Sequence, residues 1–222
     1  MGQELWLLQM FENKKYFIFD LDQTLYPKAS NIIKQIDHRI GDYCARLMDV
    51  PFEEGCRIGW KMNDDFGSTL GGLKREYKVD AEDYLQYVHD VDYSELFICK
   101  RLKKAIHLLD GQRYIYTNGT KLHARNVLEK RDLHHYFDDI YGIEEADHAA
   151  KPCPDAFKRF LHHYNIDPEY AVFFDDNLKN VQTAENLGIM AFHVLEGEPE
   201  SKGCTSIKKL SEFLLSAIKT LS

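Results

Sequence analysis

The sequence predicts an α/β fold built on an open, mostly parallel sheet, and two observations lead to it. Short, mainly apolar and aromatic runs, at 16–19, 113–116 and 170–174, are typical of central parallel strands that are buried on both faces. Segments with helical periodicity lie between these runs, and strands that alternate with helices favour a parallel sheet covered on both faces.

Three of the helical segments directly follow or separate the predicted strands. They are 121–131, then 154–164 with Pro154 in its first turn, and 178–187, which ends at Gly188. The pattern continues toward the C-terminus, where 191–194 is predicted as an edge strand and 207–221 as a closing amphipathic helix. The α/β style therefore extends over the second half of the chain.

The segment 28–96 differs, because it has helical periodicity and no convincing strand. Apolar residues recur in it at spacings of three and four, beginning with Ile32, Ile36 and Ile40, and 81–89 is a further amphipathic helix. We therefore predict a core formed by 1–27 and 97–222, with a helical domain, 28–96, inserted into it. A chain of 222 residues is long enough for both.

Composition and charge exclude several classes of protein. With 28 Lys and Arg against 36 Asp and Glu, the net charge of −8 gives no basic surface for a nucleic-acid polymer. The five cysteines are scattered and never form CxxC, which argues against a disulfide framework or a zinc site. The run Leu5–Met10 is too short for an export signal, and no stretch approaches the ~20 apolar residues needed to span a bilayer. We expect a cytoplasmic protein without membrane contact.

Polar clusters follow each of the three predicted strands, and ligands of open α/β sheets bind at the carboxyl ends of strands. The first cluster holds Asp20 and Asp22, whose side chains project to the same side of an extended segment. Two neighbouring carboxylates with little access to water repel each other unless a cation or a shared proton intervenes. Magnesium, which prefers oxygen ligands, suits such a pair, although an isolated pair of this kind is more often a solvated surface turn.

The polar clusters together resemble the four ordered motifs of haloacid dehalogenase-type phosphatases. The sequence DLDQT follows the first strand, Thr117-Asn118 follows the second, Lys151 precedes a helix, and Asp175-Asp176 follows the third. The resemblance runs from residue 16 to about residue 195. It implies a Rossmann-like core with an inserted small α-helical cap of the C1 type, and Mg²⁺-dependent hydrolysis of a small phosphomonoester through an aspartyl-phosphate.

The resemblance also assigns roles in the chemistry. Asp20 would be the nucleophile that attacks phosphorus, and Asp22 the general acid that protonates the leaving alkoxide and then activates water. Asp22 disfavours a dehalogenase, because a halide needs no proton. Lys151 would neutralise charge that develops on the transferring phosphoryl group.

The remaining motif residues would bind the phosphoryl group and the metal. Thr117 and Asn118 would donate hydrogen bonds to phosphoryl oxygens, with helix capping as the alternative role. Asp176 would bind Mg²⁺ directly and Asp175 directly or through water, while Asp20 would contribute a carboxylate oxygen and Asp22 its backbone carbonyl. A capping pair at a helix start is the alternative for the two later acids.

Two segments of the insert, 65–73 and 88–93, resemble elements of the pyrimidine 5′-nucleotidase branch of the same superfamily. This resemblance implies UMP or CMP as the substrate. A base would stack on Phe66, unless that ring packs inside the insert, while Ser68 and Thr69 would form hydrogen bonds with the base or ribose.

Other functions stay open. A sugar phosphate, phosphoglycolate or a phosphorylated nucleoside analogue would suit the same motifs as a substrate. Outside the enzymes, a phospho-accepting signalling module or a ligand-binding protein without turnover is the alternative. We expect a monomer or a dimer.

Overall fold

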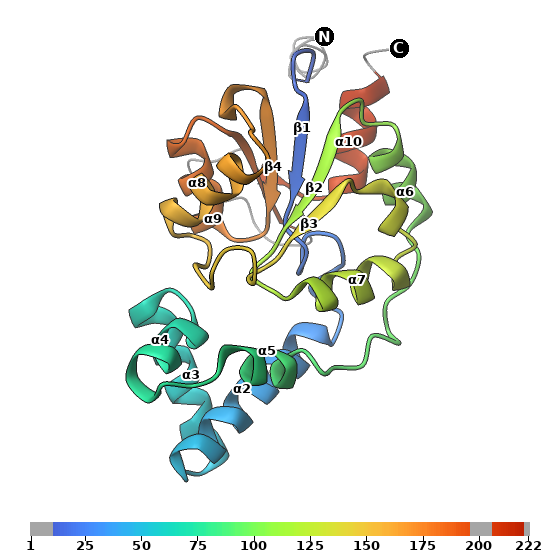
Figure 1. Ribbon diagram of the computed structural model, residues 1–222. Coiled ribbons are helices and arrows are strands. Elements are labelled where there is room, and N and C mark those ends of the chain that lie inside the picture. The colour runs from blue at the N-terminus through green and yellow to red at the C-terminus, as the bar shows by residue number, and fades with distance from the viewer. Residues whose placement is uncertain (1–10, 196–205, 220–222) are drawn as a thin grey trace.

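Six parallel strands form the sheet at the centre of the protein, in the order β3-β2-β1-β4-β5-β6. The computed structural model describes residues 11–195 and 206–219, so the run Leu5–Met10 lies outside the described residues. The predicted α/β class with a parallel sheet is confirmed (Figure 1). The strands are β1 (Tyr16–Phe19), β2 (Gln112–Tyr116), β3 (Asp139–Tyr141), β4 (Ala171–Asp175), β5 (Met190–Val194) and β6 (Ser206–Ile207).

Helices cover both faces of the sheet, as Figure 1 shows. One face packs against α6 (Lys100–His107), α7 (Lys121–Lys130) and α10 (Leu210–Lys219), and the other against α8 (Pro154–His163) and α9 (Leu178–Asn186). Each face has its own apolar cluster, because successive strand residues point to opposite faces. Phe19 and Phe174 belong to the first cluster, and Ile18 and Phe173 to the second.

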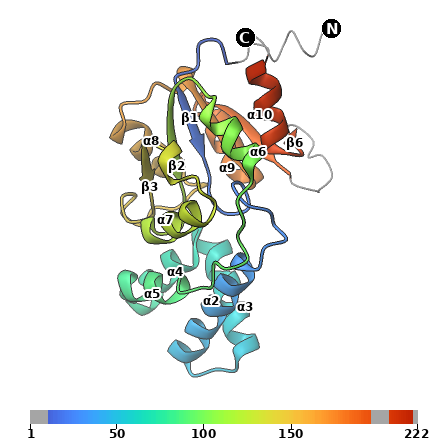
Figure 2. The same ribbon diagram turned by 90° about the vertical axis from the view of Figure 1, so that its right-hand side faces the viewer.

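A helical insert follows β1 and lies beyond the carboxyl ends of the strands, as both views show (Figures 1 and 2). It consists of α2 (Ile32–Met48), α3 (Phe52–Phe66), α4 (Thr69–Tyr77) and α5 (Ala81–Val88). The helices α2 and α3 touch backbone to backbone at glycines, since a Cβ added to Gly55 would lie 2.3 Å from the Gly41 carbonyl oxygen. The insert has an apolar cluster of its own, which includes Leu73 and Tyr84.

Two segments join the insert to the core, and they pack on each other. The first runs from Asp20 to Asn31 and the second from His89 to Cys99. The Asn31 backbone N–H donates to Glu95 at 3.1 Å, and the side-chain amide of Gln35, in the first turn of α2, donates to the Asp92 carbonyl oxygen at 3.0 Å. A movement of one connecting segment therefore displaces the other.

The sheet differs from the sequence prediction at its edges. The strand β3 was not predicted, because three residues that begin with a solvent-facing Asp139 carry too little periodicity. The strand at 191–194 was predicted to lie at an edge, but β6 pairs with β5, so this prediction is wrong. The predicted helix 207–221 begins only at Leu210, because Ile207 belongs to β6, and residues 220–222 lie outside the described part.

Stacked aromatic rings fix the register of the neighbouring strands β1, β4 and β5 on one face. Phe19 is the register partner of Phe174, and Phe174 of Phe192. The ring centroids of the first pair lie 4.8 Å apart and those of the second 5.5 Å apart, both nearly parallel. The residues that follow Phe19 and Phe174 are Asp20 and Asp175, so the same register sets these two carboxylates side by side.

Within the residues that the structure describes, no helix has the length and apolar character needed to cross a membrane.

Candidate active site

Neighbouring strands deliver Asp20 and Asp175 to the same edge and the same face of the sheet. Phe19 and Phe174 point to one face of the sheet, so the residues that follow them, Asp20 and Asp175, point to the other face. The Asp20 backbone N–H donates to the Phe174 carbonyl oxygen at 2.9 Å, which continues the ladder one residue beyond β1. Asp175 is fully buried, and Asp20 is buried with a small exposed area.

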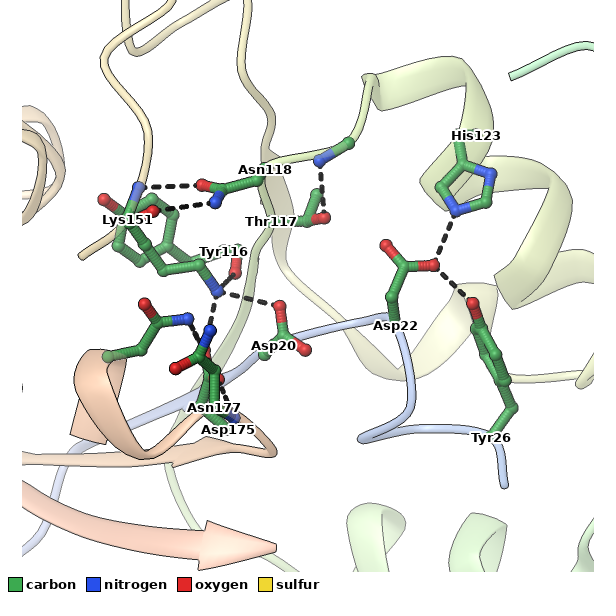
Figure 3. A network of polar contacts seen from close by, with 12 residues as sticks. Asp20, Asp22, Tyr26, Tyr116, Thr117, Asn118, His123, Lys151, Asp175 and Asn177 are labelled. Carbon is green, nitrogen blue, oxygen red and sulfur yellow. Dashed lines mark hydrogen bonds and ion pairs between the residues drawn. The ribbon is translucent and has the colours of Figure 1, made fainter. Parts of the chain in front are cut away.

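Lys151 lies between these two carboxylates (Figure 3). Its ammonium donates to Asp20 Oδ1 at 2.8 Å, to Asp175 Oδ2 at 2.8 Å and to the Tyr116 carbonyl oxygen at 2.7 Å. These acceptors use all three donors of an ammonium group. Burial alone would lower the pKa of Lys151, but Asp175 and Asp20 raise it above its ordinary value. The residue is therefore a fixed positive charge.

The negative charge of three neighbouring carboxylates exceeds the single positive charge of the Lys151 ammonium. Oxygens of Asp20, Asp175 and Asp176 all lie within 4.8 Å of one another. Burial, followed by the charge of Asp175, raises the pKa of Asp176 to about 7, and burial with the neighbouring acids raises that of Asp20 despite Lys151. The cluster thus favours an added proton or cation, which is what the carboxylates of a Mg²⁺ site require.

Asp175 and Asp176 differ in how many hydrogen bonds their carboxylates accept from other groups of the protein. Asp175 accepts from Lys151, from the Asn180 side chain at 2.9 and 3.0 Å, and from the Asn177 backbone N–H at 2.8 Å. Asp176 is partly exposed, and its backbone carbonyl oxygen lies 2.8 Å from His193 Nε2. Asp176 and the second oxygen of Asp20 are the more available ligands for a metal.

Asp22 turns away from Lys151 and toward α7. The chain leaves the extended conformation after Asp20, so the expected projection of both side chains to one side is not observed. Asp22 Oδ1 lies 2.7 Å from His123 Nε2 and also accepts a hydrogen bond from Tyr26 (Figure 3). Burial would raise the pKa of Asp22, but the charge and hydrogen bond of His123 and the Tyr26 hydroxyl lower it to about 2.

Thr117 and Asn118 lie at the end of β2, beside Lys151. The Asn118 side chain pairs with the Lys151 backbone, donating to its carbonyl oxygen at 3.0 Å and accepting from its N–H at 2.8 Å. Thr117 Oγ1 accepts from the Gly119 N–H at 2.9 Å. Both residues thus order the loop around the ammonium, and the Thr117 hydroxyl hydrogen stays available to an incoming oxygen.

The predicted substrate residues of the insert make their contacts within the insert. The Arg75 guanidinium lies 5.3 Å from the centroid of the Phe66 ring. Ser68 caps α4 by accepting from the Gly71 N–H, and the Thr69 hydroxyl donates to the Gly59 carbonyl oxygen at 2.9 Å. Thr69 also lines a pocket of about 170 Å³ between α2, α3 and α4, together with Asp37, Trp60 and Asn63.

Sequence reasoning missed His123 at this site and did not connect Tyr26 with Asp22, whereas it did expect Asn180 to support the site without binding the metal. The signal for His123 was its place in the first turn of a helix that begins directly after Thr117-Asn118, because that turn lies at the same sheet edge. Asn180 sits in the first turn after Asp175-Asp176 in the same way. Tyr26 gave no such signal, since only the turn that follows Asp22 brings its hydroxyl back to that carboxylate.

Comparison with known proteins places the chain among hydrolases. Residues 14–188 match the model of the haloacid dehalogenase-like hydrolase family. Phosphate metabolism protein 8 of Saccharomyces cerevisiae is 25% identical over 204 residues, which cover 82% of this chain and 62% of that protein. Glyceraldehyde 3-phosphate phosphatase of Methanocaldococcus jannaschii is 24% identical over 198 residues, covering 83% of this chain and 86% of that one.

Solved structures share the fold. A HAD phosphatase from Thermococcus onnurineus superposes with a TM-score of 0.59 at 20% identity, covering 89% of this chain and 95% of its own. A 2-haloacid dehalogenase from Pseudomonas syringae reaches a TM-score of 0.60 at 20% identity, covering 93% and 99%. The family match extends over most of the chain and includes β1, β2, β4 and the loop that carries Lys151. The protein is therefore a member of the haloacid dehalogenase-like hydrolase family.

Proposed function

We propose that this protein is a phosphatase that hydrolyses a small phosphomonoester through a phosphorylated Asp20. The observation that carries the proposal is the Lys151 ammonium, 2.8 Å from an oxygen of Asp20 and 2.8 Å from one of Asp175, in a cluster with more carboxylates than cations. The family match and relatives such as the glyceraldehyde 3-phosphate phosphatase support an enzyme that acts on phosphoric monoesters.

Two displacements at phosphorus account for the hydrolysis. An Asp20 carboxylate oxygen attacks phosphorus and the bond to the ester oxygen breaks. Asp22, which takes up a proton when the negative charge of the phosphomonoester lies beside it, gives that proton to the departing alkoxide. Water then attacks the phospho-aspartate, giving its proton to Asp22, and inorganic phosphate leaves with Asp20 restored. Lys151 holds one Asp20 oxygen in place and offsets the negative charge of the transferring group.

Magnesium is the cofactor that we propose for this site. Asp176 and Asp20 would hold it through carboxylate oxygens, Asp22 through its backbone carbonyl, and Asp175 directly or through water. Bound Mg²⁺ would supply positive charge next to the phosphoryl oxygens. The excess of carboxylates and the raised pKa of Asp176 support a divalent cation here.

We assign selection of the leaving group to the helical insert, 28–96, acting as a cap over the carboxyl ends of the strands. Its pocket combines an exposed indole, Trp60, with the polar groups of Asp37 and Asn63. At about 170 Å³ it is smaller than the roughly 300–1,000 Å³ of typical small-molecule sites, so it would take one part of a substrate. A pyrimidine base or a sugar suits it. A relative named for phosphorylated carbohydrates supports the sugar, and one named for phosphoglycolate supports another small substrate that is not a nucleotide.

Replacing Asp20 by Asn tests the nucleophile, because an amide does not attack phosphorus. We expect hydrolysis of p-nitrophenyl phosphate to be abolished and the mass increase of one phosphoryl group, seen in the quenched wild type, to be lost. Asp155→Asn is the matched control, because Asp155 lies on the surface in an exposed ion pair with Lys158. Activity of Asp20→Asn within a few-fold of wild type would refute the assignment.

A panel of phosphomonoesters tests the substrate class: UMP, CMP, glucose 6-phosphate, 2-phosphoglycolate and glyceraldehyde 3-phosphate. The nucleotidase hypothesis requires kcat/KM for UMP or CMP to exceed that for the others. If the sugar phosphates rank first, the resemblance of 65–73 and 88–93 to the pyrimidine 5′-nucleotidase branch does not extend to the substrate.

A further inference from the structure

A buried cluster next to Asp22 has no part in the chemistry described so far. His123 is 0% exposed, although it lies in the first turn of α7 at the edge of the site. Its Nε2 lies 2.7 Å from Asp22 Oδ1, and its Nδ1 lies 2.9 Å from the Tyr93 hydroxyl. Because each nitrogen of the His123 ring has a hydrogen-bond partner, the ring is held in a single orientation.

The hydrogen bonds to Asp22 distinguish its two oxygens. Asp22 Oδ1 only accepts, both in the ionised carboxylate and in the acid that carries its proton on Oδ2, so His123 Nε2 carries the hydrogen of the 2.7 Å bond. The Tyr26 hydroxyl donates to the same oxygen, Oδ1 (Figure 3). Both side-chain donors found among the described residues thus hold Oδ1, and Oδ2 is left to face a substrate oxygen.

The surroundings of His123 keep the ring in this place. Its backbone N–H donates to the N-cap residue Thr120 at 3.0 Å, which fixes the start of α7. The His89 ring lies 4.9 Å away, centroid to centroid. A Cβ added to Gly119 would lie only 3.0 Å from His123 Cδ2, so the glycine provides room for the ring at a position where its backbone angles do not require glycine.

We propose that His123 is a positioning residue for Asp22: by holding Oδ1 it aims Oδ2 at the ester oxygen of the substrate, and Tyr93 in turn holds His123. The inference rests on the proposed phosphatase function and adds to it the group that orients the acid. His123 does not touch the phosphoryl group in this arrangement. Its effect is confined to delivery of the proton from Asp22 to the leaving alkoxide.

Leaving groups of different basicity test this role, measured by kcat/KM, which reports the steps up to phosphorylation of Asp20. p-Nitrophenolate departs without a proton, whereas an alkoxide needs one. For His123→Ala we expect kcat/KM to fall about 10²-fold with the alkyl phosphate that the wild type turns over fastest in the panel above, the lower end for general acid catalysis. With p-nitrophenyl phosphate it falls by less than about threefold, because no proton transfer is lost.

Two further variants keep the test independent of folding. Gln has an amide N–H that can reach Asp22 and an amide oxygen for Tyr93, so His123→Gln restores most of the activity with the alkyl phosphate. Tyr93→Phe removes only the hydroxyl and gives a smaller loss than His123→Ala in the same direction. Leu122→Ala, at an exposed neighbouring position of α7, leaves both substrates unchanged.

The ratio of the two losses in kcat/KM decides the outcome. Equal losses with both substrates in His123→Ala, or in Tyr93→Phe and His123→Gln if His123→Ala does not fold, would overturn the proposal. A wild-type protein that hydrolyses neither substrate would instead remove the proposed function itself. The two failures are therefore distinguishable.

Discussion

Replacing Lys151 by Met would expose how much of the structure depends on one buried ammonium group. Methionine keeps most of the side-chain volume but removes the charge and the three hydrogen bonds to Asp20, Asp175 and the Tyr116 carbonyl oxygen. Lys151 is 2% exposed, so water does not replace these bonds without rearrangement. Removing one partner of a buried ion pair typically costs about 3–5 kcal/mol, because the other charge stays buried and unpaired.

This cost translates into a measurable loss of thermal stability. For a chain of this size each kcal/mol lowers Tm by about 2–4 °C, so we expect a decrease of roughly 6–20 °C at neutral pH. Urea unfolding should give the same loss as a free energy, measured without metal. The loss should shrink in acid, because the raised pKa of Asp20 lets that carboxyl take up a proton and then need no cation.

Lys158→Met is the matched control, because Lys158 pairs with Asp155 at 3.1 Å on the surface with both side chains mostly exposed. Such a pair contributes about 0–1 kcal/mol. If Lys151→Met lost less than about 1 kcal/mol at neutral pH, comparable to this control, the buried charge would not be the organising element that the geometry indicates.

Two other predictions concern the metal and the insert. The pKa of Asp176 is raised to about 7 in the folded protein, whereas the carboxyl ionises at a lower pH in the unfolded chain, so the metal-free protein loses stability as the pH rises toward 7. Below that pH, Mg²⁺ must displace a proton from Asp176 in order to bind. The Mg²⁺ concentration needed to raise Tm should therefore be about fivefold higher one pH unit below 7 than at 7, because half of Asp176 is already ionised at pH 7, and equal concentrations at both would contradict Asp176 as a ligand. In the insert, Gly55→Ala should destabilise the protein by about 1–3 kcal/mol in urea unfolding, because its Cβ would lie 2.3 Å from the Gly41 carbonyl oxygen. Stability unchanged in Gly55→Ala would show that α2 and α3 can separate freely.

The sequence was informative where one local pattern decided the structure. The apolar runs that became β1, β2 and β4 have no other stable place than the centre of a sheet, and their ends necessarily meet at one edge. Asp20, Asp175 and Asp176 could therefore be expected together before any coordinates, and the family resemblance added Lys151 to them. Lys151 was the least certain of these from physical reasoning alone, since only its neighbours in space distinguish it from a surface lysine.

The sequence was uninformative where long-range packing decided. The ring of His123 and the hydroxyl of Tyr26 reach Asp22 only because α7 and the first connecting segment pass the same point. Short strands such as β6 owe their existence to the neighbour β5 rather than to their own two residues. The turn after Asp20, which separates its carboxylate from that of Asp22, likewise overrides the alternation that an extended segment would have.

The ring stack of Phe19, Phe174 and Phe192 lies on the face of the sheet opposite to Asp20 and Asp175, yet it determines whether those carboxylates can cooperate. Sliding one strand by a single position would exchange its two faces and send a carboxylate into the apolar layer under α6 and α10. Variants that inactivate the protein should thus occur among residues that never approach a phosphate, and their defect would be an error of alignment between strands rather than a missing chemical group.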